Sequence, residues 1–195
     1  MAIEKRMPKD RRRRHLLDAS SEIIRTEGTQ MLTLAHVAER CGVTKPIAYQ
    51  HFGTRSGLLM ALYRDLGDNH ARAVANALDR QMTNRIALAD IAALLSTAFI
   101  DCVIENGAQY SAISAALAAS AEMDDFRQEI RNETVLTYQS IIARCFDAPQ
   151  HDLRHLLVGI LGAAEALAEA SARGSVNRGE AIASLSTIML RALQD

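Results

Sequence analysis

The chain is poor in the residues that interrupt helices or build an aromatic core. Its 195 residues include three prolines and no tryptophan, and aromatic residues make up only 4%. Runs that alternate between polar residues and Val, Ile or Thr are missing, whereas alanine is abundant. Because this composition favours helices over sheets, we predict an all-α protein whose core is mainly aliphatic.

Sequence signals for catalysis and metal binding are also missing. Cys41, Cys102 and Cys145 lie far apart among apolar residues, which indicates reduced buried thiols and leaves redox sensing by Cys102 or Cys145 as the alternative. Among six histidines, only His151 and His155 are four residues apart, a pair more typical of a helix surface than of a metal site. There is no glycine-rich phosphate loop and no nucleophile elbow. We therefore predict no catalytic residues, no metal, no cofactor and no enzymatic activity.

No segment is long and apolar enough to predict a membrane span. The uncharged run from Asn106 to Ala121 is too polar and too rich in alanine, and the apolar run from Leu156 to Ala164 has only nine residues. The charged N-terminus has no apolar stretch behind it and so does not resemble a signal peptide. The expected location is the cytoplasm, without membrane contact.

The net charge of −1 conceals an uneven distribution. Residues 1–55 contain 11 basic and 6 acidic residues, whereas residues 56–195 contain 11 basic and 17 acidic ones. Basic residues crowd an N-terminal arm that consists of Lys5, Arg6, Lys9 and Arg11 to Arg14. A basic segment beside an acidic remainder indicates a module that faces phosphates, with an arm able to follow the minor groove of DNA.

The stretch from Thr33 to Leu59 predicts a helix-turn-helix. Thr33 can cap a first short helix, and Gly42 stands where a helix end needs a residue of positive φ. Thr44 can then cap a second helix with Pro46 in its first turn, where no helical hydrogen bond is lost. The second helix of such a motif is free to enter the major groove.

These residues also carry a resemblance to the TetR family of bacterial transcriptional regulators. The turn Gly42-Val43-Thr44, the segment Tyr49-Gln50-His51-Phe52 and the segment from Thr54 to Leu59 are similar to the family pattern, over about residues 12–63. Ala48 replaces a larger aliphatic residue and Arg55 replaces a lysine. The resemblance implies a three-helix DNA-binding domain at residues 1–55 and a helical ligand-binding and dimerisation domain at residues 56–195.

Longer helices are predicted from the spacing of apolar residues and from helix-ending residues. They are expected at about 10–27, 54–78, 84–105, 108–120, 124–146, 151–172 and 176–193. The last two have more apolar surface than one monomer face needs, although ordinary core packing explains the pattern equally well. The resemblance favours a homodimer built from these helices, with Leu157, Ile160, Leu161, Ala164, Leu185, Ile188 and Met189 at its interface.

Contacts to DNA are assigned by position in the motif. Lys45, Ile47, Tyr49 and Gln50 are the predicted readers of base edges. The resemblance places phosphate contacts at Thr33, Thr44, Tyr49, His51 and Arg55. Tyr49 and Phe52 each have a second interpretation as core residues, which is the favoured one for Phe52.

The predicted function is that of a repressor released from a palindromic DNA operator by a small-molecule effector. The residues expected around that effector are Phe99, Cys102, Tyr110, Ser114, Met123, Phe126, Tyr138 and Glu165, although such a stripe can also be plain core. Two alternatives remain. One is an architectural DNA-binding protein without a ligand, and the other is a helical interaction protein whose basic arm binds an acidic partner.

Overall fold

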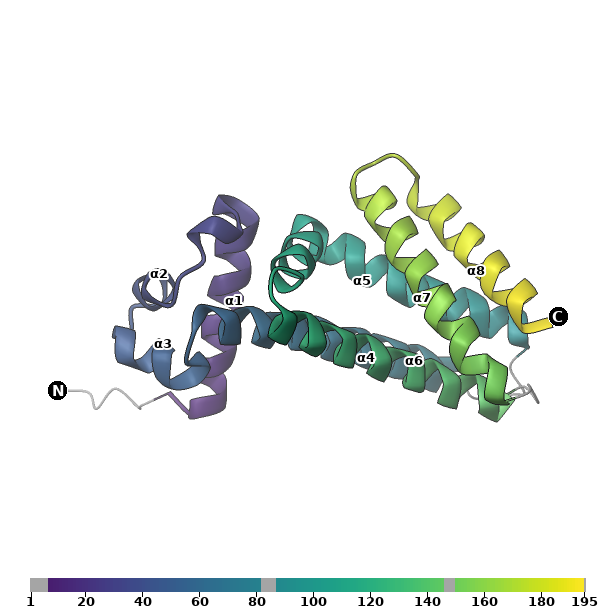
Figure 1. Ribbon diagram of the computed structural model, residues 1–195, viewed down its shortest axis with the longest axis horizontal. Helices are drawn as coiled ribbons and strands as arrows, with labels where there is room; N and C mark the ends of the chain where they lie inside the picture. The colour runs from purple at the N-terminus through teal and green to yellow at the C-terminus, as the bar shows by residue number, and fades with distance from the viewer. Residues whose placement is uncertain (1–6, 82–86, 146–149, 195) are drawn as a thin grey trace.

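The computed structural model describes residues 7–81, 87–145 and 150–194, and within these ranges the protein consists of helices without strands (Figure 1). The prediction of an all-α fold is therefore confirmed. The elements are α1 (Lys9–Glu27), the 3-10 turn η1 (Thr29–Met31), α2 (Leu34–Arg40), α3 (Lys45–Phe52), α4 (Arg55–Gln81), α5 (Leu88–Leu117), α6 (Ala121–Cys145), α7 (Gln150–Ala172) and α8 (Arg178–Gln194).

Two hydrophobic cores lie along the length of the molecule. In Figure 1, α1, α2 and α3 gather at one end and α7 and α8 at the other, while α4 and α6 run between them. The N-terminal core includes Leu58 to Leu66 of α4, Ile113 and Leu117 of α5, and Ile130 of α6. The predicted domain boundary after residue 55 lies at the start of α4. The N-terminal core nevertheless includes residues of α4, α5 and α6 that lie well beyond this boundary in the sequence.

Helix α5, from Leu88 to Leu117, consists of two helical parts that meet at Gly107, whose φ of 50° and ψ of −136° are not helical. This break agrees with the two helices predicted at 84–105 and 108–120. Glycine tolerates the positive φ, so the chain changes direction here between the two parts. Beyond the kink, Gln109 Nε2 donates to Ser21 Oγ of α1 at 2.8 Å. The second part of α5 is therefore joined to the N-terminal helices. Residues 84–86 of the helix predicted at 84–105 and residue 146 of the helix predicted at 124–146 lie outside the described residues.

Ion pairs connect the long helices. Arg14 of α1 donates from both terminal nitrogens to Asp65 of α4, at 2.7 and 2.6 Å. Arg64 of α4 pairs with Glu133 of α6. Such bidentate pairs fix the relative orientation of the helices more than they add stability, because exposed charges are screened by water.

Most of the predicted dimer interface is instead the core of a single subunit, and this prediction is wrong for six of seven residues. Leu157, Ile160, Leu161, Ala164, Leu185 and Met189 are all buried within the chain. Only Ile188 is exposed, at 42%. Helices α7 and α8 pack on α5 and on each other, and α7 also packs on α6. A strongly apolar helix face must be buried, but its spacing does not reveal whether the covering surface is intramolecular or a second subunit.

Within the described residues, the segment Leu153–Ala172 of α7 is long and apolar enough to cross a membrane, judged by length and composition alone. This segment is longer than the nine-residue apolar run from Leu156 to Ala164 that the sequence analysis considered. Its apolar side has another explanation. Leu153 and Ala168 of this segment are fully covered by neighbouring helices, and Glu165 pairs with Arg131 of α6. Of the apolar window in this segment, 28% is buried inside the described structure, so neighbouring helices cover one side of α7 and leave the other side exposed.

The junction between α3 and α4 depends on one glycine. Thr54 Oγ1 accepts the Gly57 N–H at 3.0 Å, so Thr54 caps the start of α4. A Cβ atom on Gly57 would lie 2.2 Å from the carbonyl oxygen of Phe52. Only glycine therefore lets the end of α3 approach the first turn of α4 so closely.

We predict that Gly57→Ala destabilises the protein by about 1–3 kcal/mol, because α3 must move away from α4 to admit the methyl group. Urea unfolding monitored by circular dichroism measures the loss. The matched control is Gly179→Ala at the start of α8, where the added Cβ would meet only the Asn177 side chain at 3.4 Å. Equal stability of the two variants would contradict this account of the junction.

Candidate nucleic-acid interface and internal cavity

The first half of the helix-turn-helix forms as local hydrogen bonding predicts. Thr33 Oγ1 accepts the His36 N–H at 3.1 Å, which confirms Thr33 as the cap of α2. Gly42 has a φ of 65°, and the next N–H, of Val43, donates to the Ala38 carbonyl at 2.9 Å. These bonds end α2 and turn the chain sharply toward α3.

The second helix of the motif has a buried side and an exposed side. Ala48 and Phe52 are buried against the N-terminal core. Lys45, Tyr49 and Gln50 are exposed on the other side, with Tyr49 at 52% exposure. Of the two interpretations of each aromatic residue, the structure supports core packing for Phe52 and surface exposure for Tyr49.

The remaining predicted reader and the two threonine caps lie on the same part of the motif. Ile47 is half-buried in α3. Thr33, Thr44 and Lys45 line one shallow surface hollow between the start of α2 and the start of α3. Thr44 occupies the N-cap of α3 without a side-chain capping bond, so its hydroxyl is not committed to its own helix.

Cations of α1 surround the end of α3. The pKa of His51 is lowered by burial and then by the positive charges of Lys9, Arg12 and Arg13. The guanidinium of Arg13 also lies 5.6 Å from the centre of the Phe52 ring. Part of the predicted basic arm therefore lies beside the recognition helix, where it can face phosphates. Lys5 and Arg6 of that arm fall outside the described residues.

Two predicted DNA-facing arginines have structural partners. The guanidinium of Arg55 donates from Nε to the Leu32 carbonyl at 2.9 Å and from a terminal nitrogen to the Thr29 carbonyl at 2.7 Å. Arg14 of the arm is held by Asp65. Arg55 therefore braces η1 against α4 while its side chain remains exposed, and its contact with phosphate stays a prediction. The sequence showed its charge but not the carbonyl groups that the fold places beside it.

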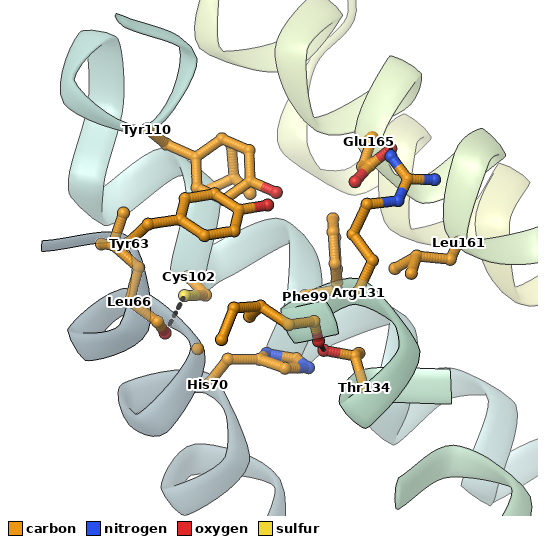
Figure 2. A pocket seen from close by; sticks show the side chains of 13 residues that line it. Tyr63, Leu66, His70, Phe99, Cys102, Tyr110, Arg131, Thr134, Leu161 and Glu165 are labelled. Carbon is orange, nitrogen blue, oxygen red and sulfur yellow. Dashed lines mark hydrogen bonds and ion pairs between the residues drawn. The ribbon is translucent and has the colours of Figure 1, made fainter. Parts of the chain in front are cut away.

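A small cavity lies between the two cores, enclosed by α4, α5, α6 and α7 (Figure 2). Its volume is about 40 Å³, enough for water but not for an organic effector. Of the eight residues predicted around an effector, Phe99, Cys102, Tyr110 and Glu165 line this cavity. Leu161, predicted at the dimer interface, lines it as well.

The other four predicted residues lie elsewhere. Met123 and Phe126 pack against the N-terminal core, and Ser114 does not line the cavity. Tyr138 does not line this cavity, but it forms a hydrogen bond with the cavity residue His70 and lines a second space beside it. Sequence reasoning missed Tyr63, His70, Arg131 and Thr134, which come from two helices whose facing sides only the fold brings together. The sequence offered one signal for His70: it is a polar residue at a spacing that is typical of the buried side of a helix.

Burial dominates the electrostatics of the cavity. Burial, together with the nearby charge of Glu105, raises the pKa of Cys102 to about 11. Cys102 therefore stays a neutral thiol at physiological pH, and thiol-based redox sensing is disfavoured at this position. Burial also raises the pKa of Glu165, while its ion pair with Arg131 lowers it. The residues that the structure describes contain no cluster of three or more metal-binding side chains.

Burial lowers the pKa of His70 to about 4, an effect that the Ala98 carbonyl partly offsets. The unfolded chain takes up a proton on this imidazole below about pH 6.5, whereas the folded chain does so only near pH 4. The contribution of His70 to stability is therefore complete above pH 6.5 and is lost as the pH falls toward 4.

We predict that the free energy of unfolding drops by about 2 kcal/mol more between pH 7.5 and 5.0 in the parent protein than in His70→Leu. Urea unfolding at both pH values measures this difference. His15→Leu removes an exposed histidine and should keep the parent's pH dependence. The same pH dependence in His70→Leu and the parent would show that His70 is charged in the folded protein.

Comparison with known proteins begins at the helix-turn-helix. The sequence model for bacterial regulatory proteins of the tetR family matches residues 16–62. The HTH-type transcriptional activator FasR of Mycolicibacterium smegmatis is 38% identical over 80 residues, which cover 41% of this chain and 36% of that protein. The HTH-type transcriptional regulator BetI of Escherichia coli is 40% identical over 67 residues, 34% of each protein. The chain thus spans about a third of the length of the curated relatives it matches.

Solved structures extend the similarity to the whole fold. A TetR-like transcriptional regulator from Rhodococcus sp. RHA1 superposes with a TM-score of 0.71 at 18% identity, covering 97% of this chain and 99% of the other. The fatty acid degradation regulator FadR from Bacillus halodurans gives 0.71 at 16% identity, covering 96% and 97%. The sequence match to the tetR family of bacterial regulatory proteins is thus confined to the helix-turn-helix region at residues 16–62, while the fold of the whole chain is similar to those of the solved regulators.

Proposed function

We propose that this protein is a dimeric, sequence-specific transcriptional regulator of the bacterial cytoplasm, a repressor that a small molecule releases from a palindromic operator. The main support for the proposal is that one side of α3 is buried and the other side is exposed. Ala48 and Phe52 anchor one side in the core, while Lys45, Tyr49 and Gln50 stand exposed on the other. A helix held in this way can enter the major groove with its outer side chains against base edges.

Charge around α3 supports the same proposal. Lys9, Arg12 and Arg13 lie close enough to His51 to lower its pKa, so they form a positive surface beside the recognition helix. Positive side chains at this place can neutralise phosphates, which supply affinity without sequence preference. Binding to duplex DNA should therefore weaken steeply with salt. Absence of salt-dependent binding would instead favour the alternative, a helical protein whose basic arm binds an acidic partner.

We predict that Gln50→Ala costs about 1–3 kcal/mol of operator binding and relaxes the preference at one base pair per half-site, because the amide can pair with adenine. Selection from random duplexes followed by affinity measurement tests this. Gln128→Ala on the exposed surface of α6 is the matched control and should select the same sequence as the parent. An unchanged selected sequence for Gln50→Ala would remove this residue from the readers.

Dimerisation is proposed through the outer surface of α7 and α8. Leu156 on α7 and Ile188 on α8 are exposed by 39% and 42%, although both are large apolar residues. Gly159 and Ala166 follow Leu156 at helical spacing on the exposed side of α7, and small residues there allow another helix to approach closely. A two-fold pair of subunits would place two recognition helices on a palindrome.

We predict that Ile188→Glu converts the dimer to a monomer and weakens operator binding, because a charge cannot be buried in the interface without a partner. Sedimentation velocity determines the state of assembly. Leu136→Glu changes an equally apolar, exposed residue of α6 (48% exposed) and should leave the dimer intact. The reverse result, with Leu136→Glu monomeric and Ile188→Glu dimeric, would move the interface to α6.

Release by a ligand is proposed through α4. This helix begins at the end of α3 and supplies Tyr63, Leu66, Gly67 and His70 to the cavity. A ligand larger than the present 40 Å³ must move these helices apart, and a pivot of α4 changes the spacing of the recognition helices in a dimer. Typical coupling of about 1–3 kcal/mol would lower operator affinity roughly 5–150-fold. If no bound molecule changed operator affinity, the architectural alternative would be favoured.

A further inference from the structure

One polar atom beside the cavity lacks a partner. His70 is only 7% exposed, and its ring packs edge-on against Phe99 with 5.4 Å between ring centres. Nε2 of His70 lies 2.9 Å from the Tyr138 hydroxyl and forms a hydrogen bond with it. Nδ1, in contrast, is buried and makes no hydrogen bond of acceptable distance and angle to any residue that the structure describes, although the Ala98 carbonyl is near enough to the ring to raise its pKa. Buried polar atoms are rarely left in this state, so Nδ1 is available to a molecule that enters the cavity (Figure 2).

The surroundings of His70 define the rest of such a molecule. Leu66, Phe99 and Ile130 give the cavity apolar walls. Its charged residues, Arg131 and Glu165, already pair with each other at the side opposite His70 in Figure 2. A ligand that brought its own charge would have to break this pair, whereas a neutral ligand would leave it in place.

A second space adjoins the first. It has a volume of about 70 Å³, and it shares Gly67, His70, Ile130 and Thr134 with the cavity of Figure 2. Its charged lining residues are Arg64 and Glu133, which pair with each other, and Asp68. A Cβ atom on Gly67 would lie 3.0 Å from Cγ2 of Ile130, so α4 and α6 meet here with little material between them. Movement of the Ile130 side chain would join the two spaces around His70 into one site for an elongated molecule.

We propose that this joined cavity binds a neutral, mainly apolar alcohol whose hydroxyl group forms a hydrogen bond with Nδ1 of His70. A hydroxyl group both donates and accepts, so it satisfies Nδ1 in either neutral tautomer of the ring. An ether oxygen only accepts, and a carboxylate or an ammonium group would add an unpaired charge. The further role of this alcohol as the effector rests on the proposed function above.

Four probes of equal chain length separate these chemistries: 1-hexanol, methyl pentyl ether, hexanoate and hexylammonium. Their affinities are measured at pH 7.5 by calorimetry and by chemical-shift changes in the full-length protein. The variants are His70→Leu, which removes the ring nitrogen, and His70→Asn, whose amide group can take the place of Nδ1. His15→Leu, at an exposed position, is the control for the substitution itself.

The expected result is that 1-hexanol binds about fivefold more tightly than methyl pentyl ether, because one additional hydrogen bond is made. His70→Leu should abolish this preference, while His70→Asn and His15→Leu should retain it. Tightest binding of hexanoate or hexylammonium, equal binding of alcohol and ether, or no binding of any probe would each overturn the proposal. A preference for 1-hexanol that persists in His70→Leu would also overturn it.

Operator affinity is measured separately with and without 1-hexanol. If the alcohol binds with the expected dependence on His70 but operator affinity does not change, the site is correct and ligand-induced release is wrong. If operator DNA is not bound at all, the regulator assignment fails while the binding data for His70 still stand. The two proposals therefore fail by different measurements.

Discussion

Burial of helix α4 in both hydrophobic cores is the constraint on which the rest of the structure depends. Its first turns place Leu58, Leu59 and Leu62 in the N-terminal core, and Val74 belongs to the core formed with α5, α7 and α8. Exposing either set would cost the apolar burial that stabilises a core. The position of the helix-turn-helix is therefore tied to the packing of the C-terminal helices, with no free linker between them.

Near the boundary of these cores the packing is incomplete. The second part of α5 continues past the Gly107 kink into the N-terminal core, and Tyr110 on this part faces the cavity beside Tyr63 of α4. The three long helices that contribute to the N-terminal core, α4, α5 and α6, thus also line the space that a ligand would fill. Close-packed elements shift together and not independently, so a change of cavity volume is transmitted to α3 without a separate device.

Charged side chains in this molecule fall into two groups: those that hold helices and turns together, and those that lie near the recognition helix. Arg14 and Arg55 hold helices and turns together through Asp65 and through backbone carbonyls. Lys9, Arg12 and Arg13, in contrast, lie near His51 at the end of the recognition helix. Net charge and sequence position do not separate the two groups. The distinction follows from which acceptors the fold brings within hydrogen-bonding distance.

The sequence by itself determined the features whose causes are local. Thr33, Gly42 and Thr54 act through bonds and backbone angles within a few residues, so the boundaries of α2 and α4 could be predicted without knowing the fold. The tertiary structure decided everything that needs a partner distant in sequence. Apolar spacing predicted that Leu161 is covered, but only packing revealed that the cavity and not a second subunit lies over it. Likewise, His70 became a candidate contact only after the fold buried it beside Tyr138 and left one nitrogen unpaired, because burial and pairing are properties of several helices together.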